Sequence, residues 1–527
     1  MIQMNRRALL ASGAVAGAGV AVAPLMKRVT AQGGAPIVLT PFVDELPIPE
    51  SLDEALTVQG QGFEDRCFAW GTPKIHEMIE AEGKHRFHRD LPETDMWLYN
   101  GQFPGPTFIN KLGVPTLIRR INQLNPVHTG FGMPESSLHH HGGHQSPVDD
   151  GWPLDFIHPG QYRDHIIPNV VPEGDTREWP STLWYHDHTI DYTGSNVYRG
   201  LAGMSLHFDA LDSGNENDTN PAALRLPSGA YDVPLVFRDV ALNADGSLLF
   251  DQLDTKGQVG NLKTVNGKVK PFLKVQRRKY RFRLLAGSIA REWMFRIWKG
   301  TTRLPFKIIA SDGGLLTAPV QVTQHQMGNA ERYEIIVDFS AFPAGTQITL
   351  NDHLIQSNGN KPAGVSPTGD PLVLFVVEGA AAAPDPSRVP TVLRPLSPVD
   401  MTRVVATRSL VLSQAGGIWT INGLPWNPNV PLFQPKLGSA EIWNVTVKGG
   451  GWDHPLHIHQ EFFRILKRGG ATPQAWERGR KDTVLLSNTT SCQLYVQFRT
   501  FTGPYVFHCH NLGHEDMAMM AWYNVIP

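Results

Sequence analysis

The sequence predicts an all-β chain built from three Greek-key β-sandwich domains. Short alternating or apolar runs recur between Pro, Gly and Asn residues, which is typical of strands; examples are Thr116–Ile121, Tyr280–Leu285, Glu441–Val447 and Cys492–Phe498. The 50 Gly and 41 Pro among 527 residues favour turn-rich β structure over helix bundles. The segment Lys74–Glu82 is ambiguous between a helix and a strand.

One plan repeats three times along the chain. An Asn-Gly pair is followed by a proline-bearing run and then by a predicted strand, with the asparagines at Asn100, Asn266 and Asn422. Each copy ends in an apolar, strand-like run: Gly203–Phe208, Pro371–Val377 and Met519–Val525. A repeat of about 160 residues fits one β-sandwich per copy.

The repeat and the shifts in composition set the expected domain boundaries. We expect domains at residues 32–212, 221–379 and 399–527. The first linker, Asp209–Asn220, is rich in Gly, Asn and Asp, and the second, Ala380–Pro398, is rich in Ala and Pro and should be semi-stiff.

The N-terminus has the features of an export signal. The twin arginines Arg6 and Arg7 precede an Ala/Gly/Val-rich stretch, Ala8–Leu25, and the small-residue pattern Val29–Ala31. These features predict a twin-arginine signal peptide over residues 1–31, recognised by the twin-arginine export machinery, and a periplasmic or secreted protein. The alternative is an uncleaved membrane anchor. The stretch is short and rich in small side chains, so we expect no stable membrane anchor after cleavage.

Charge and cysteine content exclude several classes of protein. Lys+Arg total 47 and Asp+Glu 49, so charge gives no indication of a nucleic-acid partner. Three cysteines are too few for a disulfide scaffold. After export, Cys67 and Cys492 either form a disulfide or stay free.

Twelve of the 21 histidines lie in four short segments, 139–144, 186–188, 454–459 and 508–514. A His-x-His pair on a strand places both imidazoles on one face, so that each can bind one of two neighbouring metal ions. Four such pairs are present: His139/His141, His186/His188, His457/His459 and His508/His510. Eight imidazoles can hold three metal ions and leave positions open for a small ligand. His140 and His144 fit no alternation, and we expect them to support other side chains or to face solvent.

The fourth segment indicates a second kind of metal site. Cys509, His514 and the more distant His454 supply one thiolate and two imidazoles, and Met519 can supply a long axial thioether. Two histidines, one cysteine and a weak axial methionine are typical of a blue-copper electron-transfer site. The alternatives are a buried inert thiol at Cys509 and ordinary core packing of Met519.

The two predicted sites are covalently joined, because Cys509 lies between His508 and His510. An electron accepted beside the cysteine can pass along the chain to the histidine cluster. Three copper ions and the remote one together hold four electrons, which is the number that converts O₂ into two waters. Zinc fits some of these ligands but carries no electrons, and copper heads the divalent affinity order.

These motifs closely resemble those of the three-domain multicopper oxidases. The resemblance rests on H-x-H-G, H-x-H, H-P-x-H-x-H and H-C-H-x₃-H-x₄-M, with further matching runs at Phe42–Pro49, Asn100–Thr107 and Ala330–Phe339. It is nearest the bacterial spore-coat laccases and bilirubin oxidases, and Trp452, two residues before His454, is similar to bilirubin oxidases in particular. The resemblance implies three cupredoxin-like domains.

The resemblance also implies four copper ions and assigns their ligands. The type 1 copper would take His454, Cys509, His514 and Met519, and the type 2 copper His139 and His457. The two type 3 coppers would take His141, His186 and His510, and His188, His459 and His508. The first and third domains would supply every ligand, with the cluster at their interface.

Reduction of O₂ consumes protons in a buried site, and carboxylates are the natural relays. By resemblance to spore-coat laccases, the candidate catalytic residues are Asp150 and Glu515. The alternative for Asp150, which precedes Gly151, is that it only makes a turn.

The predicted function is a copper-dependent oxidase with O₂ as acceptor. It would take single electrons from a small phenolic or pyrrolic substrate, as laccases and bilirubin oxidases do. One alternative is a metal oxidase acting on Cu(I), Fe(II) or Mn(II), although the chain lacks a methionine-rich insertion. Another is a copper-binding export protein without catalytic activity. Trp452 offers either a stacking surface for an aromatic substrate or a packing residue that shields the copper.

Overall fold

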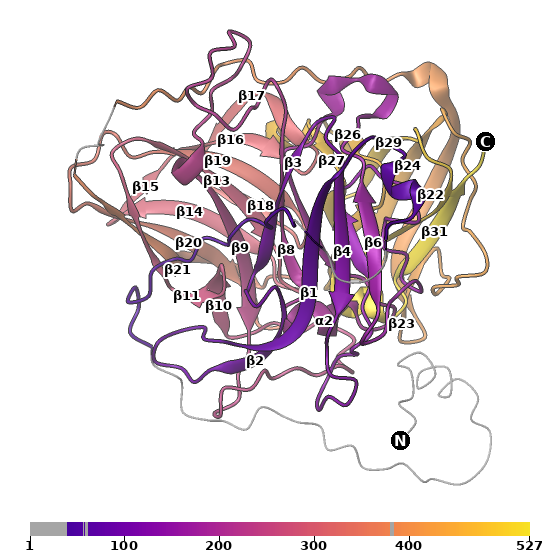
Figure 1. Cartoon of the computed structure of the whole chain (residues 1–527), viewed down its shortest axis with the longest axis horizontal. Helices are drawn as coiled ribbons and strands as arrows, with labels where there is room; N and C mark the ends of the chain where they lie inside the picture. Colours follow the sequence, from indigo (N-terminus) through magenta and orange to yellow (C-terminus); the bar gives the residue numbers. More distant parts are fainter. Residues whose placement is uncertain (1–38, 56, 58–61, 380–383) are drawn as a thin grey trace.

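Six β-sheets form three pairs, one after another along the chain (Figure 1). The structure is a computed structural model that describes residues 39–55, 57, 62–379 and 384–527. The predicted signal peptide, residues 1–31, lies outside the described residues. Strands dominate and helices are few, so the all-β prediction is confirmed.

The first pair of sheets contains strands between residues 74 and 208. One sheet has the order β2-β1-β4-β6 and the other β3-β8-β7-β5. Their bounds are β1 (Lys74–His85), β2 (Thr94–Tyr99), β3 (Gly105–Lys111), β4 (Thr116–Asn122), β5 (Leu138–His141), β6 (Tyr162–Ile167), β7 (Thr182–Asp187) and β8 (Ala202–Phe208). Met78 and Ile118 of one sheet share a core with Phe108 and Tyr185 of the other. The ambiguous Lys74–Glu82 segment is therefore a strand, paired with β2 and β4.

The second pair lies between residues 232 and 377. Its seven-stranded sheet runs β11-β10-β9-β13-β19-β16-β17, and its other sheet β12-β21-β20-β14-β15, with β18 paired to β14. The bounds are β9 (Asp232–Val240), β10 (Leu262–Val265), β11 (Lys268–Val269), β12 (Phe272–Val275), β13 (Lys279–Ala286), β14 (Trp293–Lys299), β15 (Thr302–Leu304), β16 (Phe306–Ser311), β17 (Gly314–Val322), β18 (His325–Met327), β19 (Arg332–Asp338), β20 (Gln347–Ile355) and β21 (Gly364–Val377).

The third pair lies between residues 404 and 525. Its sheets run β23-β22-β24-β29-β26-β27 and β28-β25-β30-β31. The bounds are β22 (Val404–Ala415), β23 (Ile418–Ile421), β24 (Ala440–Val447), β25 (Asp453–Ile458), β26 (Phe463–Arg468), β27 (Arg480–Lys481), β28 (Thr483–Ser487), β29 (Cys492–Gln497), β30 (Gly503–Cys509) and β31 (Met520–Val525). The strands of each pair fall inside one of the three expected domain ranges, and we use first, middle and third domain for them below.

The helices described are short. They are α2 (Thr193–Arg199), α3 (Leu512–Asp516) and the 3₁₀ turns η2 (Asp65–Phe68), η3 (Pro172–Gly174), η4 (Thr176–Glu178), η5 (Gly229–Tyr231), η6 (Met401–Arg403) and η7 (Ala475–Glu477). The two α-helices meet across the first and third domains, where Gly194 N donates to Asp516 Oδ2 at 3.0 Å. None of the helices described here is long and apolar enough to cross a membrane.

The sequence repeat corresponds to one turn made three times. Asn100, Asn266 and Asn422 have φ of 49°, 47° and 55°, and the glycine after each is also at positive φ. Two consecutive positive φ angles define the type I′ turn, which strongly favours Asn-Gly. Each asparagine Oδ1 also accepts a backbone N–H from a neighbouring strand, at 2.6–2.8 Å. The repeated Asn-Gly therefore has the same structural role in every domain.

All three cysteines are free and buried. Cys67 packs with Leu117 and Ile166 in the first domain, whereas Cys492 belongs to the core of the third. Of the two alternatives for Cys67 and Cys492, the structure has the free thiols.

Candidate metal centres

Eight histidines meet where the first and third domains face each other. In the first domain, β5 pairs with β7 so that His139 lies opposite His186. In the third, β25 pairs with β30 so that His457 lies opposite His508. The second histidine of each His-x-His pair lies two residues farther along the chain, either in the same strand or just after it. All eight side chains have no exposed surface: His139, His141, His186, His188, His457, His459, His508 and His510.

Ring nitrogens from the two domains converge within this eight-histidine centre. His457 Nε2 is 3.4 Å from His139 Nε2. His508 Nε2 is 3.2 Å from His188 Nε2 and 3.3 Å from His459 Nε2. The ligand atoms of three triads lie within 4.8 Å of one another: His139/His141/His457, His141/His186/His510 and His188/His459/His508.

Four of these histidines, His139, His186, His457 and His459, turn their outward ring nitrogen to an oxygen acceptor. The Nδ1–H of His139 donates to the Asp150 carbonyl at 2.5 Å, and that of His457 to the Asp482 carbonyl at 3.0 Å. His459 Nδ1–H donates to the Asp150 carboxylate at 2.7 Å. His186 Nδ1–H donates to the Asp187 carbonyl at 2.7 Å. A neutral imidazole has a single N–H, so the inward nitrogens carry lone pairs that face one another.

A cation satisfies such converging lone pairs, and imidazoles must be neutral to bind one. Burial, followed by the charges of neighbouring histidines, lowers the pKa of His139, His459 and His510 well below the ordinary value. Neither ring nitrogen of His510 has a hydrogen-bond partner among the described residues. The donor set therefore fits a buried metal cluster.

Two carboxylates contact the eight-histidine centre from different sides. Asp150 Oδ2 accepts from His459, and burial raises the pKa of Asp150 well above its ordinary value. Glu515 Oε2 lies 2.9 Å from His508 Nδ1, and Oε1 lies 3.5 Å from His188 Nδ1. Burial opposes ionisation of Glu515, but its interactions with the ring nitrogens of His508 and His188 outweigh burial and bring its pKa to about 2. The two carboxyl groups thus prefer opposite protonation states.

A second centre, the cysteine centre, lies wholly within the third domain. His454 of β25, Cys509 at the end of β30 and His514 of α3 bring one sulfur and two nitrogens together. Cys509 Sγ is 3.5 Å from His454 Nδ1 and 3.6 Å from His514 Nδ1, and the two nitrogens are 3.1 Å apart. Burial raises the pKa of the Cys509 thiol. A bound metal ion is what would deprotonate it.

Met519 is held beside the cysteine centre by backbone hydrogen bonds. Cys509 N donates to Met519 O at 3.0 Å, and Met519 N donates to His514 O at 2.9 Å. The Met519 side chain is fully buried in the core that also contains Cys509. Trp419 and Trp452 cover His514, with ring centroids 4.0 and 5.4 Å from it, and Trp452 is the more exposed of the two.

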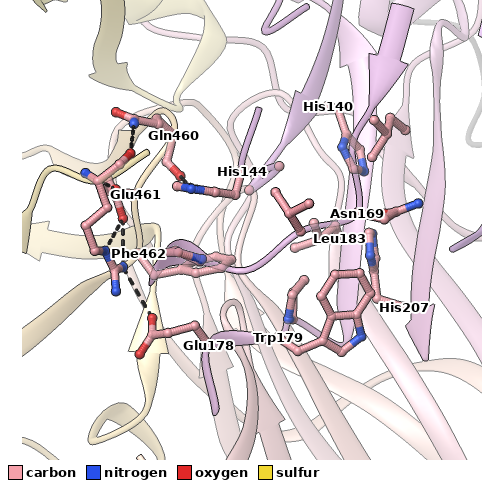
Figure 2. Close-up of a pocket in the computed structure, with 17 residues that line it drawn as sticks. His140, His144, Asn169, Glu178, Trp179, Leu183, His207, Gln460, Glu461 and Phe462 are labelled. Atoms are coloured by element: carbon pink, nitrogen blue, oxygen red, sulfur yellow. Dashed lines mark hydrogen bonds and ion pairs between the residues drawn. The ribbon is translucent and has the colours of Figure 1, made fainter. Parts of the chain in front are cut away.

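His140 and His144 lie apart from the metal triads. His140 Nε2 is 2.9 Å from Ser205 Oγ, which is 3.0 Å from His207 Nε2, so His140 points away from its two neighbours in the sequence. His144 Nδ1 lies 3.4 Å from the Gln460 carbonyl. Figure 2 shows both histidines lining a pocket between the first and third domains.

One functional candidate escaped the sequence analysis. Asp482 lies between β27 and β28, and its Oδ1 is 3.2 Å from His141 Nε2. Two guanidinium nitrogens of Arg332, in β19, donate hydrogen bonds to the same carboxylate. Neither residue belongs to a histidine motif, so spacing alone gave no signal for this contact.

Comparisons with known proteins agree with this geometry. Models of the multicopper oxidase family match residues 81–208 and 386–527. The chain is 34% identical to a bilirubin oxidase of Albifimbria verrucaria, over 92% of this chain and 82% of that protein. It is 31% identical to a laccase of Bacillus subtilis, over 92% and 98% respectively.

Solved structures show the same fold. The McoA multicopper oxidase of Aquifex aeolicus superposes with a TM-score of 0.75 at 25% identity, covering 92% of this chain and 99% of that one. A laccase of Pediococcus acidilactici gives a TM-score of 0.77 at 23% identity, covering 93% and 95%. Fold, site and relatives together define a copper-dependent oxidase that uses O₂ and a reducing substrate. The chain belongs to the multicopper oxidase family.

Proposed function

We propose that this multicopper oxidase binds four copper ions and oxidises small phenolic or pyrrolic substrates, in the manner of laccases and bilirubin oxidases. The observation that carries the proposal is the convergence of buried imidazole nitrogens from two domains on one another, while the other ring nitrogen of His139, His457 and His459 faces an oxygen acceptor. Such a geometry is costly without cations at its centre.

The proposed ligand sets follow the triads. The type 1 copper takes His454, Cys509 and His514, with Met519 as axial ligand. The type 2 copper takes His139 and His457. The type 3 coppers take His141, His186 and His510, and His188, His459 and His508. The grouping of ligand atoms within 4.8 Å supports the three sets that contain three histidine or cysteine residues, and the Nε2–Nε2 distance of 3.4 Å supports the His139/His457 pair.

Bound copper would supply one-electron redox chemistry at both centres. The protein's own part is to exclude water, to orient the imidazoles and to hold protons. We assign proton delivery to Asp150, which contacts His459, and to Glu515, which lies between His508 and His188. Four protons accompany four electrons when O₂ becomes two waters.

Two features support an aromatic reducing substrate. The relatives reported above are described as a bilirubin oxidase and laccases. Trp452 is partly exposed beside His514, whereas Trp419 is fully buried against the same ring. We assign Trp419 to shielding of the copper and Trp452 to stacking with substrate.

Oxygen uptake with matched reductants tests the proposal. The copper-loaded protein should consume one O₂ for about four one-electron oxidations of a phenol, and should oxidise bilirubin, without accumulating hydrogen peroxide. Rapid turnover of Cu(I) or Mn(II) with neither organic reductant oxidised would instead establish a metal oxidase. Copper binding without any oxygen uptake would contradict the oxidase proposal altogether.

We further propose export by the twin-arginine route, with the mature enzyme periplasmic or secreted. The support is the sequence of residues 1–31. Replacing Arg6 and Arg7 by Lys should retain the precursor in the cytoplasm, as judged by fractionation. Unchanged export of that variant would contradict the route.

A further inference from the structure

The middle domain supplies no histidine to the eight-histidine centre, yet one of its side chains is two contacts away from it. Arg332 is fully buried at the start of β19. Its Nη1 donates to Asp482 Oδ1 at 2.7 Å, and its Nη2 donates to Asp482 Oδ2 at 2.5 Å. Its Nε donates to the Thr182 carbonyl of β7 at 3.3 Å. One guanidinium therefore ties the middle domain to both domains that carry the histidines.

Asp482, held by Arg332, in turn contacts two histidines of the centre. Its Oδ1 is 3.2 Å from His141 Nε2, and its carbonyl accepts from His457 Nδ1 at 3.0 Å. The Thr483 hydroxyl donates to the same Oδ1 at 2.9 Å. Asp482 is about 1% exposed, so Arg332 is the charge that compensates it at close range. A planar guanidinium fixes both oxygens of a carboxylate, which an ammonium group does not.

His141 is oriented differently from the other histidines of the centre. It turns Nδ1 inward, 3.4 Å from His186 Nε2, and turns Nε2 outward to Asp482. Six others turn Nε2 inward: His139, His186, His188, His457, His459 and His508. The acceptor on one ring nitrogen decides which tautomer is present. Asp482 accepts the Nε2–H of His141, which leaves the Nδ1 lone pair directed at the metal site.

We propose that Arg332 is a positioning residue of the eight-histidine centre: by clamping Asp482, it fixes the tautomer and orientation of His141 and anchors His457. The inference rests on the proposed function, since it assumes copper at those histidines. It gives the middle domain a role in metal retention although that domain contributes no ligand. Partners of this kind typically change metal affinity by about 10- to 100-fold when removed.

The test is Arg332→Lys in the full-length, copper-loaded protein. A chelator should strip copper from the eight-histidine centre about 10-fold faster than in the parent. The type 2 electron paramagnetic resonance signal should change, because His457 and His141 are no longer fixed. The visible absorption of the cysteine centre should persist, since Arg332 contacts none of its residues in the described structure.

Arg281→Lys is the matched control. Arg281 is equally buried in the middle domain, holds Asp212 and Glu334 at 2.7 Å, and donates to Ser181 of the first domain at 2.9 Å. None of these three partners is a histidine of the centre. This variant should lose interface stability but keep the parental type 2 signal and copper retention. Equal copper loss in both variants would overturn the proposal, because interface loosening would then explain it.

Asp482→Asn is a second variant, which tests the proposed role of the Arg332–Asp482 pair even if Arg332→Lys does not fold. The amide keeps the shape of the side chain but removes the charge, so the same faster copper loss and altered type 2 signal are expected. Parental copper retention and signal in every variant that folds would overturn the inference alone. A parent protein that binds no copper at these histidines would overturn the proposed function first.

Discussion

The cysteine centre and the eight-histidine centre share strands β25 and β30 but are assembled in different ways. The cysteine centre takes all its residues from the third domain, through β25, β30 and α3. The eight-histidine centre takes four histidines from the first domain and four from the third. The cysteine centre depends on one domain folding correctly, and the eight-histidine centre depends also on how the domains dock.

The surroundings of the two centres differ as well. Burial alone lowers the pKa of His454 to about 3 in the cysteine centre. Around the eight histidines, Asp150, Glu515 and Asp482 lie in direct contact with the rings. A centre whose ligands form no hydrogen bond or ion pair with a carboxyl group in the described structure suits electron transfer, and a centre lined by carboxyl groups suits a reaction that consumes protons. This difference supports the proposed division of roles, with electron entry at the cysteine centre and proton-coupled reduction of O₂ at the eight-histidine centre.

Cys509→Ser should abolish electron entry at the cysteine centre and leave the eight-histidine centre in place. The variant should lose the intense visible absorption and more than about 10³-fold of its turnover with a reducing substrate. Copper at the eight histidines should remain, because their contacts do not include the Cys509 sulfur. Absorption spectra and copper analysis check this. Retained turnover would show that electrons enter elsewhere.

Asp150→Asn and Glu515→Gln should slow proton delivery to the eight-histidine centre without changing the cysteine centre. Each should lower kcat with O₂ by about 10²-fold, the size expected for loss of a positioned proton donor. The visible absorption should be unchanged, because neither residue contacts the cysteine centre through a hydrogen bond or ion pair that the described structure contains. Stopped-flow reoxidation of the reduced enzyme measures the step. Parental reoxidation rates in both variants would remove these carboxyl groups from the mechanism.

Met519→Leu should produce the smallest effect and sharpen the account of the cysteine centre. Loss of a weak axial thioether should raise the redox potential and change turnover by only a few-fold, about 2- to 5-fold, with the visible absorption retained. Met517→Leu is the control, since Met517 is buried in the same core and is not assigned to copper. Equal shifts in potential for both variants would point to core packing rather than axial ligation.

The sequence predicted what local geometry controls. A strand alternates its side chains, so the spacing of a His-x-His pair is enough to indicate a shared face. The Asn-Gly repeat that marks each domain also has a local cause, because few other residue pairs adopt two consecutive positive φ angles. The Lys74–Glu82 segment was ambiguous because its strand state depends on pairing with β2 and β4, which lie farther along the chain.

Sequence patterns did not predict the partners of Arg332, Asp482 and His140. Arg332 and Asp482 are 150 positions apart and meet only because the middle and third domains dock. His140 lies between two histidines of the centre, yet it packs against Ser205 and His207 on the opposite face of its strand. Its place between His139 and His141 on β5 puts the side chain on the opposite face, whereas its partners are set by the tertiary fold.

The most direct test is copper titration into the metal-free protein without residues 1–31, followed by copper analysis, visible absorption and electron paramagnetic resonance on the same samples. We predict four ions per chain, with one giving the cysteine–copper absorption and three binding at the eight histidines. A colourless protein that binds one ion or none would contradict the central claim that these two centres form the redox machinery of an oxidase.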